Sequence, residues 1–348
     1  MNFSRINHLK PFLKDSNKKS VLKIIFEVLH YGWIKKEAPT DYLRKFLYRK
    51  DAENYRNHLS LKEFYSIITS PKMVFPEISK LFIDKYQFYL ICKTNNLPTP
   101  EILSYNHSNQ FFYNNESTTI TKIEELLEWL KKIFETDSID ELFFKPKNGI
   151  GGYGCFILNK FNLKDEIESF SEILFKNSYI HQKCIKQHDE INKIHSKSIN
   201  SLRIDTYLDA KGQSHVLSSV MRFGTGEHIT DNTHTGGFYI AIDANSGKLK
   251  GIGRQDLVEG AGIFMRHPST NFKLEGFEVP YFFEACELAK RANLCFPNRI
   301  VGWDVAITND GPLLIEGNHN PSLHITDVAY GGYCKHPLIK EMLKEIKR

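Results

Sequence analysis

Two carboxylates and an amide occur close together in the C-terminal part of the sequence. Asp304 lies within an apolar run at residues 301–307, and Glu316 ends a second apolar run, with Asn318 two residues later. The Asn309-Asp310-Gly311 segment between the runs is typical of a hairpin turn. Pairing would bring the carboxylates side by side, where they repel unless a cation lies between them. Such hard oxygen ligands suit Mg²⁺ with bound phosphate, so we predict a metal site at these three residues; a solvent-facing hairpin is the alternative.

A glycine-rich segment could hold phosphate. Four glycines lie between apolar runs at residues 141–146 and 155–158, namely Gly149, Gly151, Gly152 and Gly154. Without Cβ atoms, the backbone N–H groups are exposed and can bind phosphate oxygens. Neither the Walker pattern nor the dinucleotide fingerprint fits, because no Gly-Lys-Ser/Thr follows and the next element reads as a strand. We predict a flexible flap between antiparallel strands, although such a hairpin can also lack a ligand.

Cationic side chains accompany both segments. Lys145 ends the strand that enters the flap, next to Pro146, where its charge could meet phosphate. Arg203 and Arg222 lie on strands predicted to enter the same site, and guanidinium groups suit bidentate contacts with phosphate or carboxylate. Exposed strand residues are the alternative for all three. Together these residues indicate a site in which a lysine and a glycine flap hold polyphosphate beside a metal.

The pattern resembles the ATP-grasp superfamily over about residues 80–330. Lys145-Pro146 and the glycines that follow look like its second lysine and flexible phosphate loop. Glu316-Gly317-Asn318 looks like its Glu-x-Asn metal motif, with Asp304 as the preceding metal aspartate. Asp84-Lys85 looks like its first nucleotide-contacting lysine.

The resemblance extends to a hinge and to a narrower branch. It implies that Gln182, Lys183 and Ile185 contact adenine and that His188 contacts ribose, although His188 could equally be an exposed loop residue. The branch called sugar-transfer-associated ATP-grasp is similar at Gln187-His188, 198–204, Asp231-Asn232, Gly236-Gly237, 267–270 and Asp41-Tyr42-Leu43. Substrate contacts are implied at Asn232, Gly236, Gly237 and His267, each of which could instead be structural.

The sequence departs from related ligases at one position. In those enzymes an arginine two residues before the metal aspartate stabilises the tetrahedral intermediate, whereas Gly302 stands there in this chain. Arg222 or Arg203 could supply this catalytic charge from another strand.

The resemblance implies an α+β, ATP-grasp fold in which two α+β subdomains grip ATP, with an N-terminal helical extension. The expected parts are a basic extension at residues 1–75, a part with the flap at 76–185, and a part with the metal site at 186–348. The implied cofactors are ATP and Mg²⁺, with two ions expected and Mn²⁺ able to substitute. The implied reaction is ADP-forming ligation of a carboxylate to an amine through an acylphosphate, in capsule or other polysaccharide biosynthesis.

Two other functions remain open. The same apparatus can serve a kinase that phosphorylates a sugar-like hydroxyl, or a nucleotide-binding scaffold that recruits a glycosyltransferase. A scaffold has no need of Asp304, Glu316 and Asn318 together, which favours an enzyme. The sequence has no Ser/His/Asp triad motif and no nucleophile elbow, in agreement with a reaction that depends on positioning and charge neutralisation.

The composition is that of a globular protein. Its 348 residues are 41% hydrophobic and 25% charged, which excludes collagen-like and disordered chains. No apolar stretch approaches the roughly 20 residues of a membrane span and no signal core opens the sequence, so a cytoplasmic location is expected. The six cysteines lack CxxC pairs and zinc spacing, as expected of reduced thiols.

The basic excess lies in the N-terminal part. Residues 1–75 contain 15 basic and 7 acidic residues. They are expected to form a helical cap that packs on the main body, or a surface for an anionic membrane, a glycosyltransferase or another partner. Nothing in the sequence indicates a nucleic-acid-binding module.

The periodicity of apolar residues predicts the elements that position these side chains. Helices are expected within residues 1–75 and at 84–95, 123–134, 163–175, 280–292 and 336–347. Strands are expected at 141–146, 155–158, 202–208, 215–221, 238–242, 301–308 and 313–316. Residues 98–122 read as a mixed segment, with a short strand or helix entry at 118–120.

Overall fold

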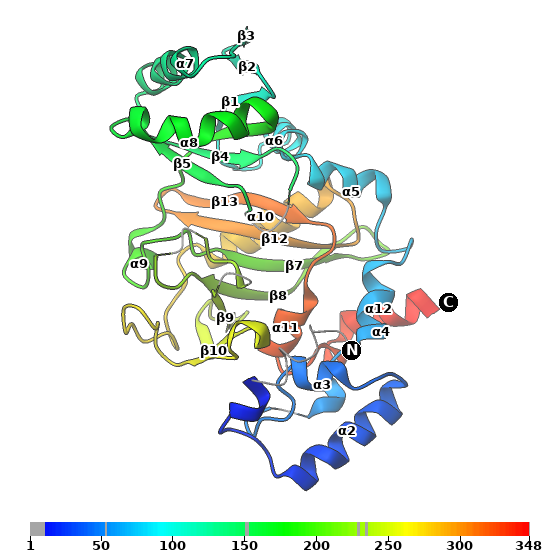
Figure 1. Ribbon diagram of the computed structural model, residues 1–348. Helices are drawn as coiled ribbons and strands as arrows, with labels where there is room; N and C mark the ends of the chain where they lie inside the picture. The colour runs from blue at the N-terminus through cyan, green and yellow to red at the C-terminus, as the bar shows by residue number, and fades with distance from the viewer. Residues whose placement is uncertain (1–10, 53, 150–152, 228–229, 234–235, 348) are drawn as a thin grey trace. The chain divides into compact units, whose positions relative to one another are not determined.

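The structure is a computed structural model that describes residues 11–52, 54–149, 153–227, 230–233 and 236–347 (Figure 1). The chain forms two compact units. One comprises Met1–Ser79, Gln187–Pro312 and Gly317–Arg348, and the other Lys80–Lys186 and Leu313–Glu316. The extension expected at residues 1–75 therefore belongs to the same unit as the C-terminal sheet, and the chain passes between the units one residue after the expected boundary at 185.

The unit that contains Lys80–Lys186 is built on a six-stranded antiparallel sheet (Figure 1). Its helices are α6 (Lys85–Thr94), α7 (Ile123–Thr136) and α8 (Leu163–Lys176). Its strands are β1 (Ile102–His107), β2 (Gln110–Tyr113), β3 (Glu116–Thr119), β4 (Glu141–Pro146), β5 (Phe156–Asn159) and β6 (Ser178–Lys183), in the order β3-β2-β1-β6-β4-β5.

Local sequence explains why α7 forms and how it packs. Glu125 accepts the backbone N–H of Lys122 and so satisfies a donor at the start of the helix. The apolar residues Leu126, Leu130, Ile133 and Phe134 recur at helical spacing and are buried. They join a core with residues of β4 and α8, where each buried side chain contributes about 1.5–3 kcal/mol.

The other unit is built on a seven-stranded sheet (Figure 1). The strands of the sheet are β7 (Leu202–Leu208), β8 (Ser214–Phe223), β9 (Phe238–Ile242), β10 (Leu249–Gln255), β11 (Ile263–Phe264), β12 (Ile300–Thr308) and β13 (Gly311–Asn318), in the order β11-β10-β9-β8-β7-β12-β13. Residues Leu313–Glu316 of β13 are counted with the unit that contains Lys80–Lys186. The helices of the unit with the seven-stranded sheet are α2 (Val21–Lys35), α3 (Thr40–Arg44), α4 (Leu61–Ile68), α9 (Asp189–Asn192), α10 (Phe282–Cys295), α11 (Leu323–Ala329) and α12 (Pro337–Lys347), and α5 (Pro76–Ile83) spans the division between the units.

The central strands of this sheet are covered on both faces. Every residue of β12 is buried. Trp303 packs against Phe296 at the end of α10, whereas Val220 and Tyr239 contact Ile325 of α11. Charged residues of β7, β8 and β12 therefore lie inside the protein, where they need compensating partners.

Most of the predicted elements form. Strands 141–146, 202–208 and 238–242 have the predicted bounds, and all six cysteines are free thiols. The mixed segment proves to contain the three-stranded meander β1–β3. Helices do form within residues 1–75, as expected, but α3 is short: it ends at Arg44, and Phe46 adopts a left-handed φ of 57° that a right-handed helix does not allow.

The N-terminal extension packs through its aromatic residues on the unit that contains the seven-stranded sheet. This agrees with the expectation of a helical cap on the main body. Tyr42, Phe46, Tyr48 and Tyr55 are buried in one cluster with residues that include Val328. A buried ion pair reinforces this packing, because Lys45 Nζ lies 2.7 Å from Asp327 Oδ2. Asp327 also accepts the backbone N–H of Tyr333 at 2.6 Å.

Removing the charge of Asp327 should destabilise the protein strongly. Burial alone would raise the pKa of Asp327, but Lys45 and His58 lower it well below its usual value. Asp327→Asn leaves the Lys45 charge buried without its partner, so we expect a loss of about 3–5 kcal/mol in the free energy of unfolding, measured by denaturant titration. Glu128→Gln is the control, since its exposed pair with Lys131 is worth less than about 1 kcal/mol. Equal losses in the two variants would contradict this account.

Candidate functional site

A lysine and a glutamate far apart in the sequence meet in the structure. Lys145, near the end of β4, is 7% exposed, and its Nζ lies 2.8 Å from Glu316 Oε2. The backbone of β13 is held nearby by Leu314, which donates its N–H to Pro98 at 2.8 Å and accepts from Thr99 Oγ1 at 2.9 Å. The site predicted from sequence requires Lys145 and Glu316 to lie close together, and in the structure they do.

A second lysine joins this pair. Lys85 is the first residue of α6, which Asp84 caps by accepting the backbone N–H groups of Tyr86 and Gln87. Lys85 Nζ donates to the carbonyl of Gly149 at 2.6 Å. Burial and the charge of Lys145 lower the pKa of Lys85 to about 8. Three lysines, Lys85, Lys145 and Lys147, share two carboxylates, Glu316 and Asp84, and this excess of positive charge attracts anions.

The glycine-rich segment connects antiparallel strands, as predicted. β4 pairs with β5 in a register that sets Phe144 opposite Phe156. Gly154 has a φ of +74°, and its carbonyl accepts the hydroxyl of Tyr179 at 3.1 Å. A Cβ on Gly154 would lie 3.2 Å from Pro146, so a side chain there is disfavoured by conformation and by space. Gly151 and Gly152 lie outside the described residues.

The predicted adenine-contacting residues lie on and after β6. Gln182 is 9% exposed, with only a long contact of 3.5 Å from Nε2 to the carbonyl of Pro100, and the Lys183 N–H donates to Glu101. Lys183 is exposed and Ile185 is half-buried. His188 caps α9, where its Nδ1 accepts the N–H of Glu190 at 3.1 Å, which gives this histidine a local structural role.

Asp304 is held between two arginines. Arg203 Nε lies 2.6 Å from Asp304 Oδ1, and an Nη of Arg222 lies 3.0 Å from Asp304 Oδ2. Burial alone would raise the pKa of Asp304, but the two guanidinium groups lower it to about 2. The carboxylate is therefore charged at neutral pH.

The same cluster includes two residues that were not predicted as site residues. Asp231 accepts both the N–H and the hydroxyl of Ser201, at 2.7 and 2.5 Å. Arg222 donates to Ser201 Oγ at 2.5 Å and lies 3.5 Å from Asp231 Oδ2. Asp231 and Ser201 thus orient Arg222. Both residues lie in segments that carry the family resemblance, 198–204 and Asp231-Asn232, but nothing in their spacing showed that they contact Arg222.

The structure explains the glycine at position 302. A Cβ on Gly302 would lie 2.9 Å from Pro321 Cβ, 3.1 Å from Asp205 Oδ1 and 3.3 Å from Arg203 Cδ. On the neighbouring strand, Arg203 pairs directly with Asp304. Pro321, Asp205 and Arg203 therefore together fill the space that a side chain at position 302 would use, and Arg203 brings its charge to Asp304 across the sheet.

The predicted metal ligands differ in their availability. Glu316 is partly exposed and bound to Lys145, and the amide nitrogen of Asn318 is buried without a hydrogen-bond partner. Carboxylate and amide oxygens of this kind fit Mg²⁺, and a phosphate oxygen would satisfy the Asn318 nitrogen. Asp304 differs from the prediction, because both of its oxygens are bound by arginine. Within the described residues, no cluster of three acidic, histidine or cysteine side chains is arranged for a metal.

The residues expected to contact the second substrate have structural positions. His267 is 1% exposed, its Nε2 contacts the carbonyl of Gly224 at 3.0 Å, and its Nδ1 accepts the N–H of Ser269 at 3.2 Å. Burial lowers the pKa of His267 to about 4, so the ring is neutral. This differs from the prediction, since a buried ring with both nitrogens bonded is not presented to a substrate.

The glycines of the predicted substrate turn are also constrained by packing. A Cβ on Gly237 would lie within 3 Å of the carbonyls of Asp231, Asn232 and Phe223. Asn232 accepts the N–H of Gly237 at 3.1 Å, and Gly236 has a φ of +88°. The conformation and the close packing of this turn therefore explain why glycine stands at both positions.

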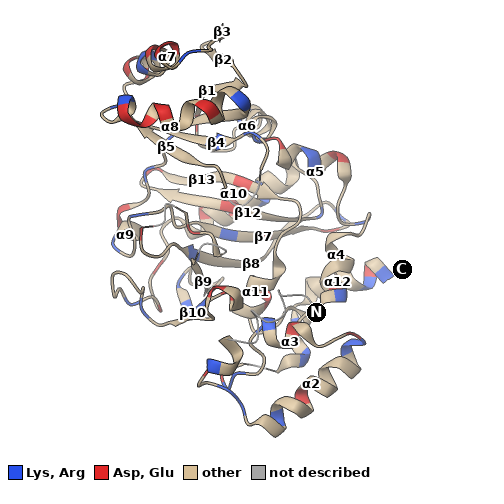
Figure 2. Cartoon of the chain, viewed as in Figure 1, with Lys and Arg blue, Asp and Glu red and all other residues tan. Residues whose placement is uncertain are grey.

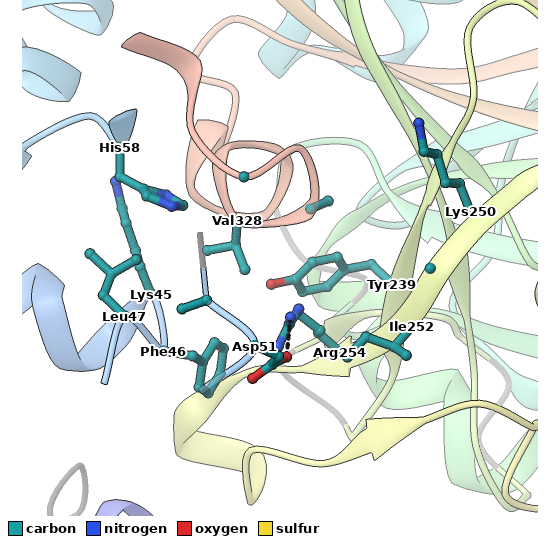
Figure 3. Close-up of a pocket in the computed structure, with 14 residues that line it drawn as sticks. Lys45, Phe46, Leu47, Asp51, His58, Tyr239, Lys250, Ile252, Arg254 and Val328 are labelled. Carbon is teal, nitrogen blue, oxygen red and sulfur yellow. Dashed lines mark hydrogen bonds and ion pairs between the residues drawn. The ribbon is translucent and has the colours of Figure 1, made fainter. Parts of the chain in front are cut away.

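A separate cavity of about 150 Å³ contains none of the predicted site residues (Figure 3). Phe46, Tyr239 and Val328 contribute to its wall. The cations in the wall are paired, because Lys45 binds Asp327 and Arg254 lies 2.7 Å from Asp51. We therefore assign the chemistry to the lysine–glutamate and arginine–aspartate clusters and not to this cavity.

Residues 70–342 match the family described as sugar-transfer associated ATP-grasp. No curated protein matches the chain at a significant level.

Solved structures resemble the chain at low identity. D-Alanyl-alanine synthetase A from Vibrio cholerae is 14% identical with a TM-score of 0.46, over 79% of this chain and 67% of its own. D-Alanine–D-alanine ligase from Bacillus anthracis is 15% identical with a TM-score of 0.45, over 84% and 76%. The ATP-grasp ligase PsnB, complexed with a minimal precursor, Mg and ADP, is 15% identical with a TM-score of 0.41, over 78% and 61%. With TM-scores below 0.5, these likenesses carry no inference about function.

The affinity for ATP should fall as pH rises through 8. A bound polyphosphate favours protonated Lys85, whose pKa is about 8 in the free protein, so binding must take up a proton above that pH. We expect the Kd for ATP to weaken by roughly 10-fold between pH 7 and 9.5, with net proton uptake in calorimetry in buffers of different ionisation enthalpy. Lys85→Arg should remove this dependence of the Kd on pH, because arginine stays protonated over the whole range. If the Kd of the Lys85→Arg variant still rose with pH to the same extent, the assignment of Lys85 as a phosphate-binding residue would be wrong.

Proposed function

Because the chain belongs to the sugar-transfer associated ATP-grasp family, we propose that it is an ATP-dependent ligase that joins a carboxylate to an amine and forms ADP. The observation that carries the proposal is the pair formed by Lys145 and Glu316, at 2.8 Å, with Lys85 beside it. A lysine that can move to phosphate and a carboxylate that can move to a metal are the complementary groups that Mg–ATP needs. The free protein would keep each charge neutralised until the nucleotide arrives.

The reaction would proceed in two displacements. A carboxylate oxygen attacks the γ-phosphorus, the bond from that phosphorus to the bridging oxygen breaks, and ADP leaves. An amine nitrogen then attacks the acyl carbon of the acylphosphate, phosphate leaves, and the nitrogen loses a proton to phosphate or solvent. Such transfer depends on positioning and charge neutralisation, which explains why no protein nucleophile is needed.

The residues of the lysine–glutamate cluster would act on the nucleotide. Lys85 and Lys145 would bind phosphate oxygens, and the backbone of the flap that includes Gly149 and Gly154 would cover them and exclude water from the acylphosphate. Gln182, Lys183, Ile185 and His188 are proposed to hold the adenosine. Glu316 and Asn318 would hold Mg²⁺, which neutralises phosphate charge when bound. Asp304 would join them only by giving up an arginine contact.

Arg203 and Arg222 would supply the positive charge that Gly302 cannot. Their contacts with Asp304 fix both guanidinium groups, and Ser201 and Asp231 further orient Arg222. Guanidinium groups fixed in advance stabilise a developing oxyanion without reorganising during the reaction. Arg203 is the stronger candidate, because it takes the space next to Gly302.

The biological setting is part of the proposal. The family name associates the chain with sugar transfer, which supports an amide-decorated sugar or a polysaccharide precursor as the product. The partners would be a sugar-linked or small carboxylate and an amine. The basic N-terminal extension would associate with a membrane surface or a glycosyltransferase.

An ADP-release screen tests the proposal directly. Purified protein with ATP and Mg²⁺ is offered uronic acids and amino acids crossed against amines, and the products are identified by mass spectrometry. We expect ADP only when a carboxylate and an amine are both present. ADP release with an alcohol alone would establish the kinase alternative and contradict the ligase.

Substitution of Glu316 tests the site within the same assay. Glu316→Gln should lower turnover by about 100-fold or more, since it removes the charge proposed to bind the metal. Glu278→Gln, at an exposed pair with Lys248, should leave turnover unchanged. Unaltered turnover in Glu316→Gln, with ADP still produced, would show that the metal is held elsewhere.

A further inference from the structure

Helix α2 presents an apolar stripe to solvent. Leu22, Ile25, Phe26, Leu29 and Trp33 follow the spacing of one helix face, and Leu22 and Trp33 are 81% and 76% exposed. Val21 and Leu13 are exposed beside them. Single exposed apolar residues are ordinary, but a contiguous stripe on one helix is typical of an interaction surface.

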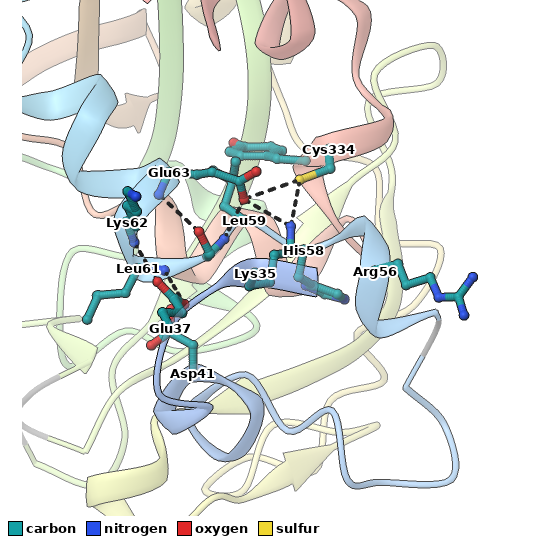
Figure 4. Close-up of polar contacts among 12 residues, drawn as sticks. Lys35, Glu37, Asp41, Arg56, His58, Leu59, Leu61, Lys62, Glu63 and Cys334 are labelled. Atoms are coloured by element: carbon teal, nitrogen blue, oxygen red, sulfur yellow. Dashed lines mark hydrogen bonds and ion pairs between the residues drawn. The ribbon is translucent and has the colours of Figure 1, made fainter. Parts of the chain in front are cut away.

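The helix is fixed to the protein by its opposite face. Ile24 and Tyr31 are buried in the aromatic cluster of the extension, and Glu27 accepts from Tyr42 Oη at 2.6 Å and lies 2.8 Å from Lys19 Nζ. Its last residue, Lys35, lies 2.9 Å from Glu63 Oε2, within the polar cluster that includes Cys334 (Figure 4). The apolar stripe therefore faces outward because the other face is already occupied.

Within the described residues 11–40, the exposed charged residues are lysines. These are Lys14, Lys23 and Lys36. Figure 2 shows basic residues toward both ends of α2 and an acidic residue between them. The two acidic residues of the segment from residue 11 to 36 point inward, since Glu27 binds Lys19 and Asp15 lies 2.6 Å from Arg49. Glu37, next to Lys36, is half-buried and accepts the backbone N–H groups of Leu61 and Lys62. An apolar stripe flanked by exposed lysines, with Trp33 and Phe26 in it, complements an anionic lipid surface.

We propose that α2 is an interfacial helix that docks the protein on membranes containing anionic lipids. Phe26, Leu29 and Trp33 would enter the boundary between head groups and acyl chains, and Lys23 and Lys36 would contact the phosphates. The 15-residue helix would lie along the surface. Over the described residues, no helix is both long and apolar enough to cross a bilayer. The proposal is independent of the ligase reaction, because it uses none of the residues assigned to it.

Vesicle co-sedimentation of the full chain tests the proposal. We expect the bound fraction to be at least 10-fold higher on vesicles of phosphatidylcholine with a quarter phosphatidylglycerol than on phosphatidylcholine alone, and to fall in 0.5 M NaCl. The fluorescence of Trp33 should shift to shorter wavelength on binding. Trp33→Phe should remove this shift, since Trp303 is fully buried and Trp129 packs against the core of the other unit.

Matched variants separate the stripe from general hydrophobicity. Phe26→Glu with Trp33→Glu should lower vesicle binding at least 10-fold without changing the melting temperature. The control pair, Phe161→Glu with Leu294→Glu, removes exposed apolar residues elsewhere and should bind as the unaltered protein does. Lys23→Gln with Lys36→Gln should weaken binding only to the anionic vesicles.

Three results would overturn the proposal. The first is no binding to anionic vesicles, and the second is equal loss in the control pair. The third is sedimentation velocity showing a dimer that the Phe26→Glu, Trp33→Glu variant converts to a monomer without any vesicle binding, because a second copy would then cover the stripe.

Discussion

Compensation of buried or half-buried charge is the constraint on which the candidate site depends. Lys145 and Asp304 are both almost inaccessible to solvent, so each needs an opposite charge within hydrogen-bonding distance. Lys145 pairs with Glu316, and Asp304 pairs with Arg203 and Arg222. These pairs also define what the site can do, because each one holds a charged group that a nucleotide or its metal could take over.

The two clusters differ in their capacity to change partners. Glu316 is partly exposed and pairs with Lys145, so exchanging this lysine for a metal would require less desolvation than an exchange at the buried Asp304. Asp304 is bound on both oxygens and its pKa is about 2, which makes it the fixed point around which the two arginines are ordered. In the proposed reaction, the first cluster would bind the nucleotide, and the second would keep two guanidinium groups in place for an acyl intermediate.

The sequence predicted the parts of the structure that local pattern determines. The alternation of residues predicted strands 202–208 and 238–242 with their bounds, and Asp84 marked the start of α6. The meander β1–β3 was not resolved from sequence because its strands are short and β3 is exposed along its length, so no alternation of burial is imposed on it. The end of α3 depends on a left-handed Phe46, for which the sequence carries no turn residue.

The residues of the candidate site were predictable only where a motif carried them. Lys145, Glu316 and Lys85 were found this way and lie together. The roles of Ser201 and Asp231 could not be predicted, because their contacts join residues that are far apart in the sequence. The burial of His267 likewise depends on tertiary packing, which the spacing of residues does not reveal. Gly302 was recognised as a departure, but its cause, the approach of Pro321 and Arg203, required the structure.

The binding of ATP to Lys145→Ala by titration calorimetry tests the central claim most directly. If Lys145 leaves Glu316 for phosphate, losing its charge-assisted hydrogen bonds should weaken the affinity for ATP by roughly 10- to 100-fold. Lys160→Ala, at a surface pair with Asp140, should bind ATP as the unaltered protein does. An unchanged Kd in Lys145→Ala, with the fold intact by circular dichroism, would contradict the account.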